Sequence, residues 1–153
     1  MKQLDIGVVF KFENTIKNIL IKNSPKDNCN VIYKIPCKDC NSIYIGQTGK
    51  DIDSRIAQHK YSIRTGQASN SLFVHLRDFG HRINWNLSSV ICKSNNFIER
   101  NIIESSLIQI TWQNNMNTSK GLYSLDQVIL SMMERDFIHL KDKLIPQGSN
   151  EVR

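Results

Sequence analysis

The sequence predicts a fold of mixed helices and strands, α/β in the broad sense and α+β in the narrow one. It should contain a small three-stranded antiparallel or mixed sheet flanked by helices. Three observations lead to this prediction. Two short β-prone runs, Val31 to Ile35 and Ser42 to Gln47, flank a tight polar connection, which is typical of a hairpin. A third β-prone run covers Leu87 to Lys93. The segments between and after these runs carry apolar residues at helical spacing.

The composition fits one globular domain. The chain has 153 residues, of which 40% are hydrophobic and 22% charged, close to ordinary globular usage. A formal net charge of +6 favours a polyanionic partner without identifying one. The chain has neither an apolar run long enough to span a membrane nor a secretory signal, so we expect an intracellular protein with no membrane partner. Its four cysteines are then expected to be thiols or metal ligands.

The pattern divides the chain into three segments. Residues 1–30 form a lead-in with a weak edge strand at Asp5 to Phe12, a short helix up to Leu20, and a turn-rich linker from Asn23 to Asn30. Residues 31–121 form the core domain. Residues 122–153 form a C-terminal helix and tail, because Ser124 and Gln127 have the spacing of a capping box and Pro146 ends the pattern.

Three helices are expected within the core domain. The first runs from Ile52 to about Arg64, with Asp51 as its cap and Gly66 after its end. Its sheet-facing residues are Ile52, Ile56 and Ile63.

The second helix opens at Ser69 or Ser71 and stops at Gly80. The third, from about Asn96 to Trp112, is rich in isoleucine and should be largely buried. The Asn-rich run from Asn114 to Gly121 is predicted to be a loop.

Four polar side chains of the hairpin and first helix are placed where they could converge. Tyr33 and Tyr44 lie in the two hairpin strands, while Arg55 and His59 are one turn apart on one face of the helix. Two phenols, a guanidinium and an imidazole could therefore form one site.

This arrangement resembles the GIY-YIG endonucleases. The triplet that ends at Tyr33 reads VIY, so Val31 stands where the family name has glycine, while the triplet Tyr44-Ile45-Gly46 is intact. The Cys-x-x-Cys between the two triplets is similar to the variant carried by Penelope-like retroelements. The resemblance extends from the hairpin to about Gly121 and implies the fold predicted above.

The resemblance also implies roles in phosphodiester hydrolysis. Tyr33 would be the general base or its relay, and Tyr44 would hold the attacking water or the phosphate. Arg55 would clamp the phosphate through two N–H groups, and His59 would be an alternative base or a proton shuttle. Which group takes the proton stays open at this stage.

A carboxylate and an amide complete the implied site. Glu104 corresponds to the single metal-binding glutamate of the family and would hold Mg²⁺ or Mn²⁺. Arg100, one turn earlier, would either orient Glu104 or touch DNA. The supporting asparagine of the family is assigned to Asn117 rather than to Asn114 or Asn115.

Cys37, Cys40, His75 and His81 form a second group. The spacing of these residues allows a closed tetrahedral zinc site but also a redox-active or unbound thiol pair. Resemblance to the Penelope-like variant favours structural zinc. Cys29 and Cys92 are interpreted as ordinary linker and core residues.

Each candidate residue taken singly also has an ordinary structural explanation. Strand tyrosines usually pack, an arginine and a histidine at helical spacing usually form a solvated face, and Glu104 could simply pair with Arg100. The joint order and spacing of the set favour a site.

The resulting hypothesis is a metal-dependent endonuclease that nicks DNA. In the elements that the chain resembles, the nick supplies a 3′-hydroxyl primer for reverse transcription, which implies a nuclear protein and contact with element RNA through a fused reverse transcriptase. The alternative is a catalytically inactive, zinc-stabilised nucleic-acid-binding module. The sequence leaves open the oligomeric state, the target sequence and whether a polymerase is fused.

Overall fold

The computed structural model describes residues 28–126. Within this range the chain forms the predicted α+β fold, built on a sheet of three strands: β1 (Val31–Pro36), β2 (Ile43–Thr48) and β3 (Ser89–Lys93). The strand order is β2-β1-β3 and both pairings are antiparallel. The strand and helix expected before residue 28 and the helix expected from Ser124 to Pro146 lie wholly or almost wholly outside the described residues.

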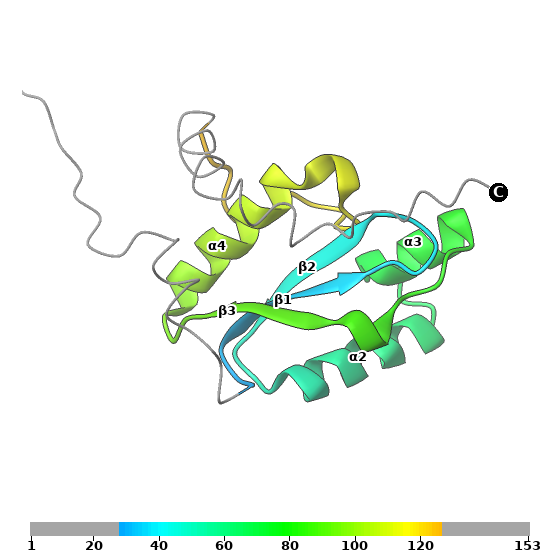
Figure 1. Ribbon diagram of the computed structural model, residues 1–153, viewed down its shortest axis with the longest axis horizontal. Coiled ribbons are helices and arrows are strands. Elements are labelled where there is room, and N and C mark those ends of the chain that lie inside the picture. The colour runs from blue at the N-terminus through cyan, green and yellow to red at the C-terminus, as the bar shows by residue number, and fades with distance from the viewer. Residues whose placement is uncertain (1–27, 127–153) are drawn as a thin grey trace, which may run out of the picture.

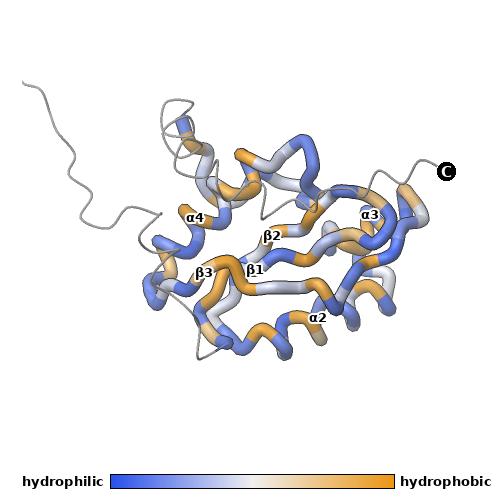
Figure 2. The backbone as a smooth tube through the Cα atoms, in the orientation of Figure 1, coloured by the Kyte–Doolittle hydropathy of each residue, from blue (hydrophilic) through white to orange (hydrophobic). Residues whose placement is uncertain are grey.

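Helices cover both faces of the sheet. Helices α2 (Ile52–Arg64) and α3 (Ser71–Phe79) lie on one side, and α4 (Phe97–Ile110) crosses the other (Figure 1). Apolar residues recur at intervals between polar ones along α2 and α4, whereas the middle of β3 is continuously apolar (Figure 2). This spacing gives each helix one apolar stripe that can be buried against the sheet.

Alternate strand residues supply two cores, one on each face of the sheet. Val31, Tyr33 and Ile35 point toward α2 and α3, while Ile32 of β1 and the two isoleucines of β2, Ile43 and Ile45, point toward α4. As predicted, the α2 residues in the first core are Ile52, Ile56 and Ile63.

The helix starts are fixed by side-chain caps. Asp51 accepts the N–H groups of Asp53 and Ser54, as the sequence predicted for α2. The cap of α3 is Asn70, and neither Ser69 nor Ser71, which we had expected, fills this position. Asparagine is as good a cap as serine, so the pattern of residue types alone could not separate the three positions.

Two boundaries differ from the prediction by two residues, and one strand pairing is irregular. The third strand begins at Ser89, because Trp85–Leu87 form a short 3-10 turn and the Leu87 side chain is exposed. A β-bulge then shifts the pairing of β3 with β1 between Ile32 and Tyr33. The helix that we expected to reach Trp112 ends at Ile110, and a 3-10 turn follows at Trp112–Asn114.

The prediction that α4 is largely buried holds for the body of the helix but is wrong for its first turn. Phe97 and Ile98 are exposed, whereas the later turns bury Ile103, Leu107 and Ile108 against the sheet. The first turn extends past the sheet, so its apolar residues have no strand to pack on.

Candidate active site

The outer edge of β2 is covered by one isolated backbone bridge, in which the Met116 N–H donates to the Ile43 carbonyl at 2.8 Å, and by two side chains. In an antiparallel pair, the backbone N–H and C=O groups of every second residue bond to the partner strand. The backbone groups of Ile45 and Gln47 belong to the other set and point away from β1. The N–H of Ile45 donates to Oδ1 of Asn117 at 2.9 Å, and Asn117 Nδ2 donates back to the Ile45 carbonyl at 2.8 Å. The N–H of Gln47 donates to Oε1 of Glu104 at 3.0 Å. Asn117 and Glu104 are thus both fixed by backbone groups of one edge strand.

Tyr33 in β1 lies directly opposite Gly46 in β2. The two residues are register partners, and the Tyr33 ring is fully buried. A Cβ at position 46 would lie 2.6 Å from the Tyr33 oxygen and 2.9 Å from a ring carbon of Tyr44, closer than real Cβ contacts allow. The glycine of the second triplet is therefore needed because two tyrosine side chains occupy the space above it.

Helix α2 brings Arg55 and His59 to the Tyr33 hydroxyl. Arg55 Nε donates to the Tyr33 oxygen at 3.4 Å, and His59 Nε2 lies 2.8 Å from the same oxygen. Arg55 also donates from Nη1 to Gln58, which holds the guanidinium in place on the helix. The predicted convergence of these residues on one face of α2 is confirmed.

Tyr44 closes the other side of the group. Its ring packs edge-on against His59, with 5.1 Å between ring centroids, and lies 6.3 Å from the ring of Tyr33. Burial raises the pKa of the Tyr44 hydroxyl, and the nearby Arg55 guanidinium opposes this effect. Tyr44 is therefore a neutral phenol, able to donate or accept a hydrogen bond.

Burial also sets the protonation of Tyr33 and His59. It raises the pKa of Tyr33 well above the ordinary value, with Tyr44 and Glu104 adding to the effect and Arg55 opposing it. Burial, reinforced by Arg55, lowers the pKa of His59 to about 4. At neutral pH the site therefore pairs a neutral phenol with a neutral imidazole.

Glu104 is a carboxylate with a perturbed pKa. Burial raises the pKa of Glu104 to about 7, while the hydrogen bond from the Gln47 N–H and the charge of Arg55 act in the opposite direction. Its other oxygen, Oε2, makes no hydrogen bond within the described part of the chain. That oxygen is available to a cation, and one carboxylate oxygen with water is a donor set that suits Mg²⁺.

Arg100 acts on Glu104 indirectly. Its buried guanidinium donates from Nε to Oε1 of Gln47 at 3.3 Å and from Nη1 to the Ser94 carbonyl at 2.8 Å. It thereby fixes Gln47, whose backbone N–H holds Glu104. Of the two roles that we considered for Arg100, the geometry matches orientation of Glu104.

The structure therefore brings together most of the residues predicted for the site. Tyr33, Tyr44, Arg55 and His59 form one group, and Glu104 lies near enough for its charge to act on both tyrosines and on Arg55. Asn117 supports the site through the backbone of Ile45, between Tyr44 and Gly46. Their catalytic roles remain predictions.

Two residues with a place in this arrangement were missed by the sequence analysis. Gln47 links Arg100 to Glu104, and Asn70 donates from Nδ2 to Nδ1 of His59 over 3.3 Å. Asn70 carried a weak signal, since it immediately precedes a helical pattern. Gln47 carried none, because its role depends on which backbone groups the fold leaves at a sheet edge.

The cysteines and histidines of the second group also come together. The ligand atoms of Cys37, Cys40, His75 and His81 all lie within 4.8 Å of one another. Cys40 Sγ is 3.6 Å and His81 Nδ1 is 3.1 Å from Nε2 of His75. Tetrahedral zinc would space such atoms at about 3.5 Å and about 3.3 Å, so the four residues fit a closed zinc site.

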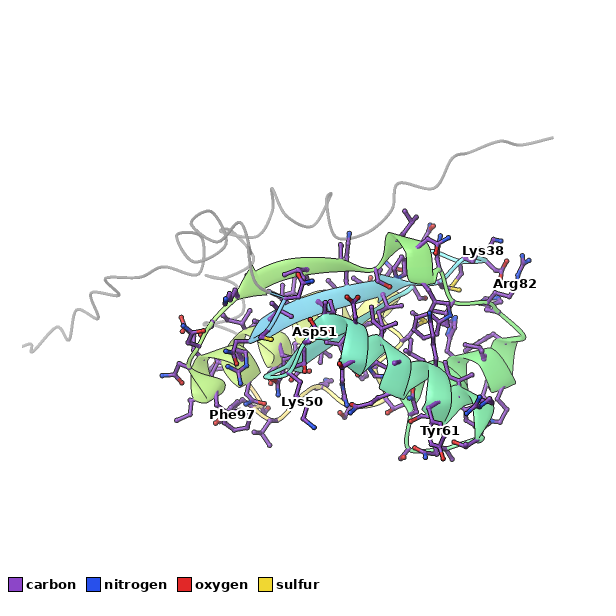
Figure 3. The ribbon with its side chains drawn as sticks, turned by 90° about the horizontal axis from the view of Figure 1, so that it is seen from below. Lys38, Lys50, Asp51, Tyr61, Arg82 and Phe97 are labelled. Carbon is purple, nitrogen blue, oxygen red and sulfur yellow. The ribbon has the colours of Figure 1, made fainter. Side chains whose placement is uncertain are left out.

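Direct contacts hold the same region together. The Lys38 N–H donates to the Arg82 carbonyl at 2.8 Å, and the Asn84 N–H donates to the Pro36 carbonyl at 2.9 Å. Asp39 and Arg82 form an exposed ion pair. Lys38 and Arg82 lie at the same end of the molecule, far from the start of α2 at Lys50 and Asp51 (Figure 3).

Comparison with known proteins gives one match. The model of the GIY-YIG catalytic domain family matches residues 29–117, which is more than half of the chain and contains the edge-strand site and the Cys-His group. No curated protein and no solved structure matches the chain. No helix among the described residues is long and apolar enough to cross a membrane.

Proposed function

The chain belongs to the family of GIY-YIG catalytic domains, a family of nucleases, and from this premise we propose that it is a divalent-metal-dependent endonuclease that nicks DNA. The observation that carries the proposal is the hydrogen-bonded group at the edge of β2. Arg55 and His59 both contact the Tyr33 oxygen, and Glu104 is held beside them by the Gln47 N–H. A cation, a proton-transfer pair and a carboxylate within one site are the groups that phosphodiester hydrolysis requires.

The proposed reaction is attack of water on phosphorus. The Tyr33–His59 pair takes a proton from the water, whose oxygen forms a new bond to phosphorus. The bond from phosphorus to the 3′ oxygen breaks, and its electron pair stays on that oxygen, which takes a proton from solvent and leaves as a 3′-hydroxyl. Arg55 is half-buried and keeps N–H groups beyond those bonded to Tyr33 and Gln58, so it can contact two phosphate oxygens.

Glu104 is the proposed ligand of the divalent cation, Mg²⁺ or Mn²⁺, which would offset negative charge on the phosphate and on the leaving oxygen. The carboxylate has a second effect within the protein. Its charge raises the pKa of Tyr33, so neutralising this charge would bring the phenol closer to ionisation.

The Cys-His group is proposed to hold a structural zinc ion. Four protein ligands would leave no position for water, so this ion would take no part in cleavage. Cys37 and Cys40 belong to the connection after β1, whereas His75 and His81 lie within and just beyond α3. The ion would therefore tie the hairpin connection to the end of α3.

The biological context is proposed from the resemblance to Penelope-like retroelements. In that context the 3′-hydroxyl primes reverse transcription, the protein works in the nucleus, and a polymerase in the same polypeptide would bring element RNA. The net charge of +6 is compatible with a DNA partner.

A plasmid-nicking assay with Mg²⁺ added or chelated tests the function. Conversion of supercoiled to open-circular plasmid is expected only with the metal, and the products should carry 3′-hydroxyl ends that a polymerase extends. DNA binding without nicking under any divalent metal would favour the inactive nucleic-acid-binding module. Val31 stands where the family name has glycine, and this departure from the motif is compatible with that alternative, but its side chain is fully buried in the core shared with α2, away from solvent.

A further inference from the structure

The orientation of the Asn70 side chain is fixed by the helix that it caps. Its Oδ1 accepts the N–H of Leu72 at 3.0 Å, as the N-cap of α3 requires. An amide nitrogen cannot accept that hydrogen bond, so the two amide atoms cannot exchange places. Nδ2 is therefore the atom that faces His59.

This contact determines where the imidazole proton lies. Asn70 Nδ2 is 3.3 Å from His59 Nδ1 and can only donate, so Nδ1 must be the unprotonated ring nitrogen. A neutral imidazole has one N–H, and the buried His59 is neutral because its pKa is lowered to about 4. The proton is therefore on Nε2, which lies 2.8 Å from the Tyr33 oxygen.

Two donors then meet at one oxygen. His59 donates from Nε2 and Arg55 donates from Nε over 3.4 Å, both to the Tyr33 oxygen. Tyr44 also packs on the imidazole, through a T-shaped contact of the two rings, and no hydrogen bond joins it to Nδ1 within the described part of the chain. Hydrogen bonds of this kind stabilise the charged form of an acid.

We propose that Asn70 is a positioning residue that holds His59 in the Nε2–H tautomer and thereby directs a second hydrogen-bond donor to Tyr33. The catalytic consequence rests on the proposed nuclease function. In this tautomer His59 has no free lone pair, so it cannot take the proton of the attacking water. Burial keeps the Tyr33 hydroxyl protonated at neutral pH, so the phenolate is a minor species that forms by loss of this proton to solvent and is stabilised by Arg55 and His59. The phenolate oxygen then takes the proton from water.

Substitutions at position 70 can separate this role from helix capping. Asn70→Asp and Asn70→Ser both keep a good cap, so their melting temperatures should stay close to that of the wild type. Aspartate can only accept, which favours a proton on Nδ1 and makes Nε2 an acceptor. Serine is too short to reach His59, so it should leave a mixture of tautomers. Ser69→Asp adds the same charge at the neighbouring exposed position and serves as the matched control.

The direct measurement is a long-range proton–nitrogen NMR correlation on the full chain, with the His59 signals assigned by their loss in His59→Gln. We expect Nε2–H in the wild type and in Ser69→Asp, and Nδ1–H in Asn70→Asp. The kcat for nicking should fall at least about tenfold in Asn70→Asp, with an unchanged KM for DNA, and less in Asn70→Ser.

Three results would overturn the proposal: an Nδ1–H tautomer in the wild type, an unchanged tautomer in Asn70→Asp, or an unchanged kcat despite the switched tautomer. A wild-type protein that shows no nicking would instead reject the proposed function. The NMR result would then support or reject the assignment of Asn70 on its own.

Discussion

The backbone N–H of Gln47 donates to Oε1 of Glu104 over 3.0 Å and joins the edge of β2 to α4 at the carboxylate proposed to bind the metal. This hydrogen bond favours the ionised form of Glu104, yet burial prevails and raises the pKa to about 7. The site thus holds a carboxylate whose charge is unfavourable until a cation arrives, and this has a measurable effect on stability.

We predict that Glu104→Gln is more stable than the wild type at pH 8 without divalent metal. An unfolded glutamate ionises near pH 4.5, but Glu104 in the folded protein does so only near pH 7. The stability that the protonated side chain contributes is complete below pH 4.5 and is lost as the pH rises through 7. Thermal melts should show a gap at pH 8 that closes near pH 4. A variant that is less stable at pH 8 would contradict this account.

The same substitution should abolish metal-dependent nicking. Glutamine keeps an oxygen that can accept the Gln47 N–H but is a poor ligand for Mg²⁺. Glu99→Gln, which changes a carboxylate in the first turn of the same helix, is the control and should retain activity. Plasmid nicking by Glu104→Gln at the wild-type rate would place the metal elsewhere.

Gly46→Ala should damage both stability and activity. The new methyl group would lie 2.6 Å from the Tyr33 oxygen, so the buried ring of Tyr33 or the strand must move. Overpacking of this kind costs about 1–3 kcal/mol. Gly49→Ala meets the end of the Arg100 side chain at 3.3 Å and should cost less. Denaturant unfolding measures both, and equal losses in the two variants would argue against a special role for Gly46.

Arg55→Lys should reduce nicking by about a hundredfold, because an ammonium group cannot donate to Tyr33 and still make a planar two-point contact with phosphate. Arg64→Lys is a matched control, since Arg64 is exposed on the same helix and packs over the Tyr61 ring. Single-turnover rates on a nicking substrate distinguish the two variants. Comparable rates for Arg55→Lys and the wild type would show that Arg55 makes no two-point contact with the phosphate.

Local signals in the sequence were sufficient for much of the fold. The Asp51 cap, the hairpin and the apolar stripe of α2 each depend on residues close together in the chain, and all are confirmed. The predicted start of the third strand was wrong because the residues that follow Leu87 are β-prone, although the Leu87 side chain is 60% exposed. That position depends on how the chain approaches the sheet, which local spacing does not encode.

The sequence predicted the site residues whose side-chain type has a known chemical role. It missed the residues whose role depends on their position in the fold. Tyr33, Arg55 and His59 could be singled out by type and spacing. Asn70 and Gln47 act through an amide orientation and a backbone N–H, and these become meaningful only once α3 is capped and β2 is an edge strand. No property of either residue in isolation marks it as part of a site.

The structure also changes what removal of zinc is expected to do. The hairpin connection is short and polar, so its own side chains offer little apolar surface to hold it against α3 without a metal. The connection in fact pairs with residues 82–84 through the Lys38 and Asn84 N–H groups and through the Asp39–Arg82 ion pair. The sheet and α4 should therefore stay folded without the ion, and loss should be confined to the region around α3.

We therefore predict that Cys37→Ser lowers the melting temperature by about 10 °C but leaves a folded protein, since a few kcal/mol of metal binding is lost while the backbone pairing remains. Cys29→Ser, in the partly exposed segment before β1, should melt like the wild type. Elemental analysis of protein purified without chelator should find one zinc per chain. Less than about half an equivalent, or full zinc in the Cys37 and Cys40 double variant, would reject the site, because thiolates and imidazoles held within 4.8 Å of one another supply all four proposed ligands.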